Sequence, residues 1–241
     1  MTPTSDAAAY AIREGRLDDA IASYEALADQ GVVGSSLAFD RGIAYALRAR
    51  SGRGLPGDFG RAAHGFEEAL RRDPHDVQAR RTLDEIRRDV ARRDAQATGK
   101  AEELASTPIA RTMLFALPGD AWAGIALAAS ALLAVSLAAR PRLRRGRRLA
   151  ASTVAIVTTV VALAASALGA SGAWVRAHLR EAVIVAPRTF ATSDDGTPFE
   201  LDEGARVDVL EERATTAQVQ NDKGTGWAPR DALRILPPYR P

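Results

Sequence analysis

The chain has 241 residues, room for one or two domains, and its 32 basic and 30 acidic side chains leave a formal net charge of only +2. That balance argues against a general polyanion-binding protein. The absence of cysteine excludes disulfides, thiolate nucleophiles and cysteine-based metal sites.

The first part of the chain contains an internal repeat. "YAIREGRLDDAIASYEALADQG" over 10–31 and "YALRARSGRGLPGDFGRAAHGFEEALRRDP" over 45–74 both begin with Tyr-Ala and continue with a glycine and an Ala-x3-aromatic pattern. We expect the small alanines to let two antiparallel helices approach, and the aromatic residue one turn later to fill the space beside them. Gly15 and Gly57 would make the turns, and Pro74 would stop the second unit.

This pattern resembles tetratricopeptide (TPR) repeats and indicates an all-α TPR-like helical repeat domain over 6–98. An unrelated pair of alanine-packed helical hairpins is the alternative. TPR arrays bind extended peptides or helices along the inner face of their first helices. On that resemblance the candidate partner-binding residues are Ile12, Arg13, Phe39 and Leu47, although Phe39 and Leu47 could equally belong to the core.

The stretch "HDVQARRTLDEIRRDVARRDAQA" predicts a third, capping helix with an apolar stripe formed by Val77, Leu83, Ile86 and Val90. Its many charges are interpreted as a solvated face, with a binding patch as the alternative. Since arrays usually need about three repeat units for stability, this domain is expected to be stabilised by contact with a partner or with the membrane.

Two apolar runs follow a linker over 99–118. Residues 119–139 and 149–175 each predict a transmembrane helix, because about 1.5 Å per residue lets both cross a hydrocarbon layer about 30 Å thick. The alternative, a buried hairpin of a soluble protein, would need a larger core than the rest of the chain supplies. Trp122 and Trp174 lie near the outer ends, where indoles favour the membrane interface.

The connection "RPRLRRGRR" over 140–148 contains six arginines. Short loops dense in arginine stay on the cytoplasmic side, so the block predicts a topology anchor in contact with anionic lipid head groups. A nucleic-acid patch is the alternative, but the loop lacks aromatic residues and both its ends are tethered. The anchor residues are Arg140, Arg142, Arg144, Arg145, Arg147 and Arg148.

This orientation would place residues 1–118 and 176–241 together in the periplasm, outside a bacterial inner membrane. "MTPTSDAAAYAIREG" has neither a basic nor an apolar region, so no signal peptide is visible. We favour a true start upstream. The alternatives are that the first span carries its N-terminal domain across, or that the topology is inverted and the protein is a cytoplasmic-facing adaptor.

Residues 181–238 predict five short strands, which favour a small all-β barrel over an enzyme fold. We expect strands at "AVIVA", "ARVDVLEE", "TAQVQ", "GWAP" and "LRIL". Val207 and Val209 would point inward, and Ser193-Asp194-Asp195-Gly196 would form a turn.

The pattern Leu-x-Glu-Gly-x-x-Val-x-Val-Leu over 201–210, followed by Gly-x-Gly-Trp-Ala over 224–228, resembles bacterial SH3-like domains. In those domains the Glu-Gly turn precedes a strand and Gly-Trp packs the barrel. Proline-rich ligand binding is not implied, because the acidic, tyrosine-bearing loop of the eukaryotic domains is not evident. Trp227 is interpreted either as a core residue or as a ligand-facing aromatic.

Catalysis has little support. His64, His75 and His178 lack metal-ligand spacing with one another, and the glycines of "SGRGLPGD" lack the Lys-Ser/Thr that a phosphate loop requires. We therefore expect no enzymatic activity, catalytic residue, cofactor or metal.

The order of TPR units, two-span hairpin and SH3-like tail resembles the BatE-type proteins of the Bat aerotolerance gene clusters. The resemblance implies a membrane-anchored protein–protein interaction scaffold in a stress complex, with von Willebrand A-domain membrane proteins and a MoxR-type ATPase as family neighbours. The alternative is a cell-wall sensor whose SH3-like domain recognises peptidoglycan peptides. The expected partners are the lipid bilayer and other membrane proteins, and not nucleic acid.

Overall fold

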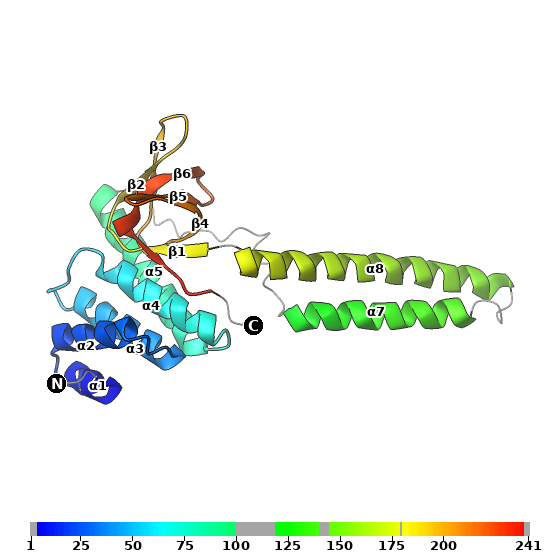
Figure 1. Cartoon of the computed structure of the whole chain (residues 1–241), viewed down its shortest axis with the longest axis horizontal. Helices are drawn as coiled ribbons and strands as arrows, with labels where there is room; N and C mark the ends of the chain where they lie inside the picture. The colour runs from blue at the N-terminus through cyan, green and yellow to red at the C-terminus, as the bar shows by residue number, and fades with distance from the viewer. Residues whose placement is uncertain (1–3, 100–118, 140–144, 179, 239–241) are drawn as a thin grey trace. The chain divides into compact units, whose positions relative to one another are not determined.

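The computed structural model of the chain divides it into two compact units (Figure 1). The head is formed by Met1–Ser106 together with Leu179–Pro241, and the hairpin by Thr107–His178. The chain therefore leaves the head, forms the hairpin and then returns to the head. The residues that the structure describes are 4–99, 119–139, 145–178 and 180–238.

Helices make up the N-terminal part of the head. Within residues 4–99 they are α1 (Ser5–Arg13), α2 (Leu17–Asp29), α3 (Ser35–Arg50), α4 (Asp58–Arg72) and α5 (Val77–Thr98). The turns before α2 and α4 form at Gly15 and Gly57, whose φ angles of +71° and +86° suit glycine. Both turns were predicted from the sequence and are confirmed.

Small residues let these helices approach closely. Ala20 with Tyr24 in α2, and Ala62 with Phe66 in α4, are all fully buried, which confirms the predicted pairing of an alanine with an aromatic residue one turn later. Where α3 meets α4, a Cβ atom added to Gly65 would lie 2.8 Å from the Ala38 carbonyl oxygen. The backbones of α3 and α4 are therefore in direct contact.

Helix α5 departs from its prediction at one end. Leu83, Ile86 and Val90 are buried as expected, but Val77 is 61% exposed and does not belong to the apolar stripe. Val77 is the first residue of the helix, directly after the capping residue Asp76, whose carboxylate accepts the N–H groups of Gln78 and Ala79 in the first turn.

The C-terminal part of the head is an antiparallel sheet with the strand order β3-β2-β6-β5-β4-β1-β7. Among the described residues no ladder joins β3 to β7, so the sheet is open, whereas the sequence predicted a small barrel. A short 3-10 helix, Arg230–Ala232, precedes the last strand. The strands are β1 (Arg180–Ile184), β2 (Thr189–Thr192), β3 (Pro198–Leu201), β4 (Arg206–Glu212), β5 (Thr216–Gln220), β6 (Thr225–Pro229) and β7 (Leu233–Ile235).

The sequence prediction found five of these strands and missed β2 and β3. These two form a hairpin around the predicted turn at Ser193–Gly196, where the Gly196 N–H donates to the Ser193 carbonyl at 2.9 Å. In β2 only the small Ala191 enters the sheet core, while Phe190 is 53% exposed. In β2 the large apolar side chain is therefore exposed and the small one is buried, which is the reverse of the pattern by which a strand is recognised.

The sheet buries an aliphatic core on one face. Val207 and Val209 point into it as predicted, and Leu210 is exposed on the other face. The core consists of Ala182, Ile184, Ala191, Leu201, Val207, Val209, Ala217, Val219, Ala228 and Leu233.

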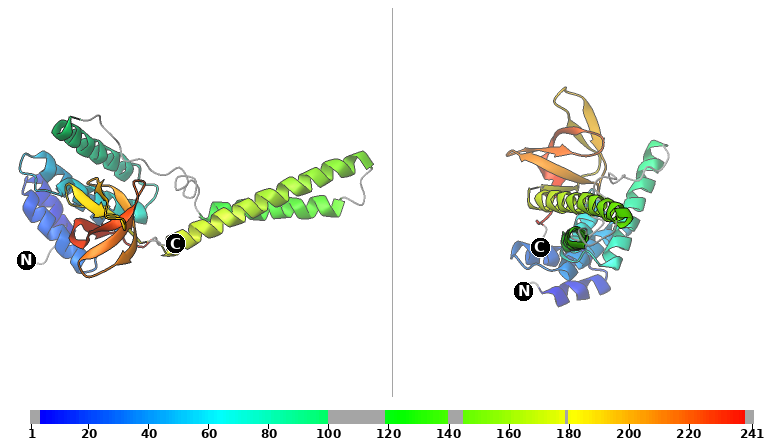
Figure 2. Two further views of the ribbon diagram at one scale, coloured as in Figure 1. Left: turned by 90° about the horizontal axis from the view of Figure 1, so that it is seen from above. Right: turned by 90° about the vertical axis from the view of Figure 1, so that its right-hand side faces the viewer.

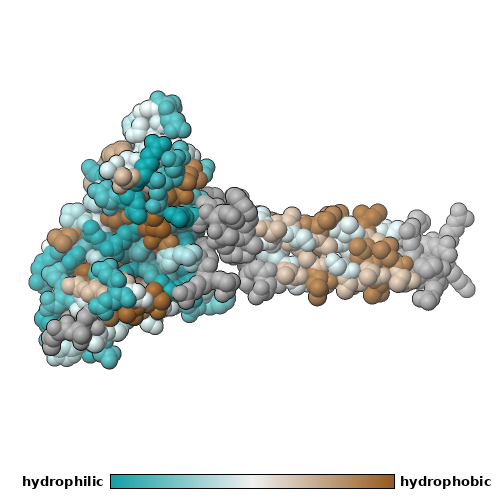
Figure 3. All heavy atoms as spheres, in the orientation of Figure 1, coloured by the Kyte–Doolittle hydropathy of each residue, from teal (hydrophilic) through white to brown (hydrophobic). Residues whose placement is uncertain are grey.

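The hairpin consists of α7 (Gly119–Ala139) and α8 (Arg145–His178). Each contains a window with a mean hydropathy of 2.0, Ala121–Ala138 and Ser152–Ser171, long enough to cross a membrane. Within the structure only 0% and 11% of these windows are buried, and Figure 3 shows apolar residues on their surface. These exposures differ from those of a core helix in a soluble protein. They are weak evidence for membrane association.

Helix α7 matches its predicted bounds, whereas α8 begins inside the predicted arginine loop. The two helices pack on each other, and a Cβ atom added to Gly169 in α8 would lie 3.3 Å from the Trp122 Cβ atom in α7. Gly169 thus lies at the contact between the two helices, where a residue without a side chain permits close packing.

Helix α4 lies directly against β1, and the right-hand view of Figure 2 shows the strands stacked on the helices of the head. A Cβ atom added to Gly60 would lie 2.6 Å from the Ile184 carbonyl oxygen and 2.7 Å from the Val185 Cα atom. Only a glycine allows this approach of helix to strand.

We therefore expect Gly60→Ala to lower the free energy of unfolding of the head by about 2 kcal/mol, because the added methyl group collides with backbone atoms. Alanine otherwise favours a helix over glycine by about 1 kcal/mol, so the sign of the effect is diagnostic. Urea denaturation of the full chain in lipid nanodiscs, followed by hydrogen exchange of the β1 amides, measures it.

Gly34→Ala is the matched control, since nothing lies within 4 Å of its added Cβ atom. Gly34 is the N-cap of α3, where glycine is preferred to alanine, so this change should cost about 0.5 kcal/mol, clearly less than Gly60→Ala. A Gly60→Ala protein as stable as the wild type would contradict the close packing of α4 on β1.

Candidate functional site

Strand β1 lies between the helical core and the sheet core of the head. Ala182 and Ile184 enter the sheet core, while Val183, between them, is fully buried in the core of the helices. Because successive side chains of a strand point to opposite faces, β1 is covered by the sheet on one side and by the helices on the other. We call this contact of β1, the following turn and β7 with α2, α4 and α5 the junction.

Charged side chains are buried at the junction. Arg71 of α4 and Glu181 of β1 form an ion pair with side chains only 3% and 2% exposed. Arg71 also donates a hydrogen bond to the Pro237 carbonyl oxygen at 2.6 Å. Removing one member of such a pair leaves an uncompensated buried charge, so the two parts of the head depend on each other.

A second buried carboxylate comes from the turn before β4. Glu203 accepts the backbone N–H of Gly60 at 2.8 Å and a hydrogen bond from Arg93 of α5 at 2.6 Å. Its neighbour Gly204 has a φ of +76°, which makes the predicted Glu-Gly turn. The glutamate of this turn therefore binds the first turn of α4, where unpaired N–H groups attract negative charge.

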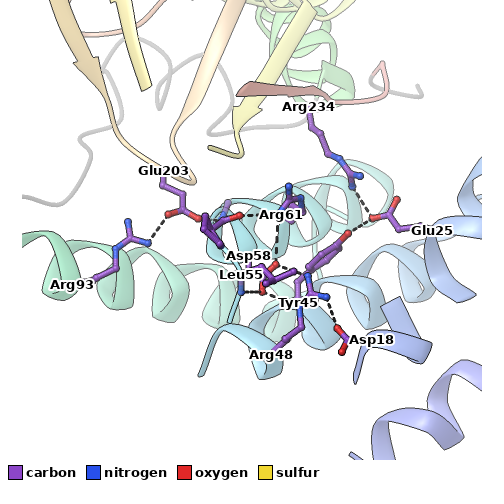
Figure 4. Close-up of polar contacts among 12 residues, drawn as sticks. Asp18, Glu25, Tyr45, Arg48, Leu55, Asp58, Arg61, Arg93, Glu203 and Arg234 are labelled. Atoms are coloured by element: carbon purple, nitrogen blue, oxygen red, sulfur yellow. Dashed lines mark hydrogen bonds and ion pairs between the residues drawn. The ribbon is translucent and has the colours of Figure 1, made fainter. Parts of the chain in front are cut away.

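Glu25 of α2 makes the third polar link (Figure 4). It accepts hydrogen bonds from Tyr45 and from Arg234 of β7, both at 2.8 Å. Burial raises the pKa of Glu25, but Arg234, Arg41 and Tyr45 together outweigh burial, so that the net pKa is lowered. The Glu25 carboxylate is thus held in its charged form. Burial also raises the pKa of its partner Tyr45, to about 12.

The loop between α3 and α4 is fixed from within the helical part. Asp58 is 1% exposed and binds Arg48 through two hydrogen bonds of 2.9 and 2.7 Å, and it accepts the Leu55 N–H at 2.8 Å. Arg48 reaches Asp18 as well, at 2.6 Å (Figure 4). The start of α4 is therefore fixed by these bonds on the helical side and by the Glu203 hydrogen bond on the sheet side.

His64 is a buried titratable group at the junction. Its Nε2 atom lies 3.2 Å from the Ile235 carbonyl oxygen, which can only accept, so Nε2 carries the proton. The Nδ1 atom is buried and has no hydrogen-bond partner within the described part of the chain. Burial, and then the charge of Arg41 on α3, lowers the pKa of His64 to about 4; Glu68 and Arg234 are its other charged neighbours.

An unfolded histidine has a pKa of about 6.5, so the unfolded chain binds the His64 proton more readily than the head does. The stability that this neutral histidine contributes is complete above about pH 6.5 and is lost as the pH falls toward about 4. We expect His64→Gln, which keeps a donor for Ile235, to reduce the fall in melting temperature between about pH 7 and about pH 5.

Differential scanning calorimetry of the full chain in nanodiscs gives this fall for each variant. His75 is exposed, and His75→Gln is the matched control, expected to match the wild type. Equal falls in the wild type and His64→Gln proteins would show that His64 does not set the pH response.

The four predicted groove residues lie on α1 and α3, away from the junction. Ile12 and Phe39 are half-buried against the helical core, and the Phe39 ring lies 5.4 Å from that of Phe66. Arg13 is exposed, with its guanidinium 5.7 Å from the Tyr10 ring, and Leu47 is 40% exposed. Phe39 thus belongs mainly to the core, whereas Leu47 and Arg13 offer a free surface.

Trp227 lies on the outer face of the sheet. Its neighbours Gly226 and Ala228 are buried while Trp227 is half-buried, so the indole is outside the sheet core. The Arg213 guanidinium lies 3.7 Å from the ring centroid, a cation–π contact. The indole is therefore half-exposed, with Arg213 stacked on the ring.

Other predicted sites receive less support. Arg140, Arg142 and Arg144 lie outside the described residues, and Arg145, Arg147 and Arg148 lie in the first turn of α8, where only the backbone is described. Within the described ranges no group of three or more histidine, aspartate or glutamate side chains is placed to hold a metal ion.

A scan against known protein families gave no match, and neither did searches among curated proteins and among solved structures.

The buried charges of the junction were missed from the sequence. Helical periodicity and strand alternation each describe one element, and they do not reveal that Arg71 on a helix meets Glu181 on a strand that follows far later. One signal was present: the uninterrupted apolar run from Ala182 to Ala186 is typical of a strand buried on both faces. Such a strand requires a cover from outside its own sheet, and the helices supply it.

Proposed function

We propose that the protein is a membrane-anchored scaffold that displays two protein-binding surfaces on one rigid head. The observation that carries this proposal is the course of the chain. It leaves the head after α5, forms two apolar helices and returns at β1, which the head buries on both faces. A segment inserted into a single folded unit can cross a membrane only an even number of times.

The proposed fold of the two parts remains that of TPR repeats and a bacterial SH3-like domain. Support for the first comes from the alanine–aromatic packing of α2 and α4 and the glycine turns before them. Support for the second comes from the Glu203-Gly204 turn before β4 and the Gly-Trp pair in β6. Together with the hairpin they give the module order of BatE-type proteins, so we propose a Bat-type stress or aerotolerance complex as the setting, with von Willebrand A-domain proteins as partners.

The proposed location is a bacterial inner membrane with the head in the periplasm. The arginine block between α7 and α8 supports this orientation, since short arginine-rich loops stay in the cytoplasm. The surfaces proposed for partners are the exposed parts of α1 and α3, with Arg13 and Leu47, and the outer sheet face with Trp227. Both surfaces would then face the same compartment.

Labelling of single cysteines tests this topology without background, because the chain has no cysteine of its own. We expect Ser36→Cys and Thr197→Cys, both exposed positions of the head, to react with a membrane-impermeant maleimide on intact spheroplasts. Gly146→Cys, in the arginine block, should react only after permeabilisation. Labelling of only one head position would contradict the single head, and labelling of Gly146→Cys alone would invert the orientation.

A second candidate function is recognition of peptidoglycan peptides, which the position of the half-buried Trp227 outside the sheet core, beside Arg213, favours. In that case Trp227→Ala should abolish retention of the full chain on isolated peptidoglycan while leaving its melting temperature unchanged, because the indole lies outside the core. Sedimentation with peptidoglycan measures retention. The control is Phe190→Ala, which removes an exposed aromatic from the same sheet. No retention of the wild type would leave the scaffold as the function.

A further inference from the structure

The outer face of α3 carries a stripe of side chains at helical spacing. Ser36 and Leu47 are exposed, and Asp40 and Ile43 between them are half-buried. Residues three and four positions apart lie on one face of a helix, so these four side chains form a continuous surface. We call it the α3 stripe.

Asp40 is the unusual member of this stripe. Among the described residues its carboxylate has neither a hydrogen bond nor an ion pair, and burial raises its pKa. Other buried or half-buried carboxylates of the head have partners. These are Glu25, Asp58, Glu67, Glu68, Asp76, Asp89, Asp94, Glu181, Asp202 and Glu203.

A second polar group near Asp40 also lacks a partner. Tyr24 of α2 is fully buried, and its hydroxyl makes no hydrogen bond to the described residues. Burial, and then the negative charge of Asp40, raises the pKa of Tyr24 to about 12.

The chain's own nearby arginine does not neutralise Asp40. Arg13 acts on Tyr24 from the other direction, lowering its pKa, but its guanidinium lies 5.7 Å from the centroid of the Tyr10 ring. The Asp40 carboxylate is half-buried and keeps its negative charge unpaired among the described residues, so it is complementary to a cation that reaches it from outside the chain.

We propose that Asp40 anchors a lysine or arginine side chain of a partner protein, whose aliphatic residues pack on Ile43 and Leu47. This inference rests on the proposed scaffold function and names the chemistry of its partner. Leu47 lies seven residues beyond Asp40, about 10 Å along the helix axis. The partner therefore presents its basic and aliphatic side chains about 10 Å apart, which is three residues of an extended strand or seven of a helix.

The first test needs no ligand. Since no internal cation balances Asp40, Asp40→Asn should leave the melting temperature of the full chain in nanodiscs unchanged or raise it by about 2 °C. Glu68→Gln is the matched control on the neighbouring helix, because Glu68 binds Arg41 and Arg72, and it should lower the melting temperature. A lower melting temperature for Asp40→Asn would show that Asp40 has a partner within this chain and would overturn the proposal.

The second test selects a phage-displayed library of random dodecapeptides on the wild-type chain in nanodiscs, with counter-selection on Asp40→Asn. We expect enrichment of peptides with a basic and an aliphatic residue at the stated spacing. Their affinity should fall about tenfold on Asp40→Asn, and equally when glutamine replaces the basic residue. Affinity should be unchanged on Trp227→Ala.

Absence of basic residues from the selected peptides, or equal binding to Asp40→Asn, would overturn this inference. Peptides that bind the head independently of Asp40 would leave the scaffold function standing. Failure of the scaffold itself would show in the cysteine labelling, which does not depend on Asp40.

Discussion

The head depends on one strand being buried from two sides. β1 has the helices of the N-terminal part on one face and the sheet core on the other, and Glu181 of this strand binds Arg71 of α4. Buried ion pairs seldom add much stability over apolar packing. Breaking one leaves an uncompensated buried charge, however, so separating the two parts of the head is energetically costly. The helical part and the sheet therefore behave as one body, although each has the pattern of a separate module.

Much of the fold could be predicted, because it follows from local periodicity. The helices from Ser5 to Thr98, both apolar helices and five of the strands are features that spacing and turn residues reveal. The β2–β3 hairpin escaped since its alternation is reversed, with Phe190 outside and Ala191 inside. The open sheet escaped because closure depends on whether β3 and β7 meet, which no local pattern encodes.

The site was harder to predict than the fold. Arg13, Leu47 and Trp227 were chosen from module resemblance, and all three lie on surfaces that the junction leaves free. The charges that join the modules could not be found that way, since pairing Arg93 with Glu203 requires the tertiary structure. The charged side chains of α5 were interpreted as a solvated face, yet Arg87 and Arg93 bind acids on α4 and in the turn before β4, and Asp89 binds an arginine of α3. A helix face rich in charged residues can therefore take part in tertiary contacts.

The interruption of the head by the hairpin has a consequence for biosynthesis. During translation α4 emerges long before β1, and both apolar helices leave the ribosome between them. Until Glu181 and Glu203 arrive, Arg71 and the glycine-lined side of α4 have no cover, and the nascent helices remain incomplete. A ribosome that stopped at the end of the hairpin would release a chain with an unfinished interior, a natural substrate for chaperones and proteases. Maturation of the head is in this way timed by the delivery of about the last quarter of the chain.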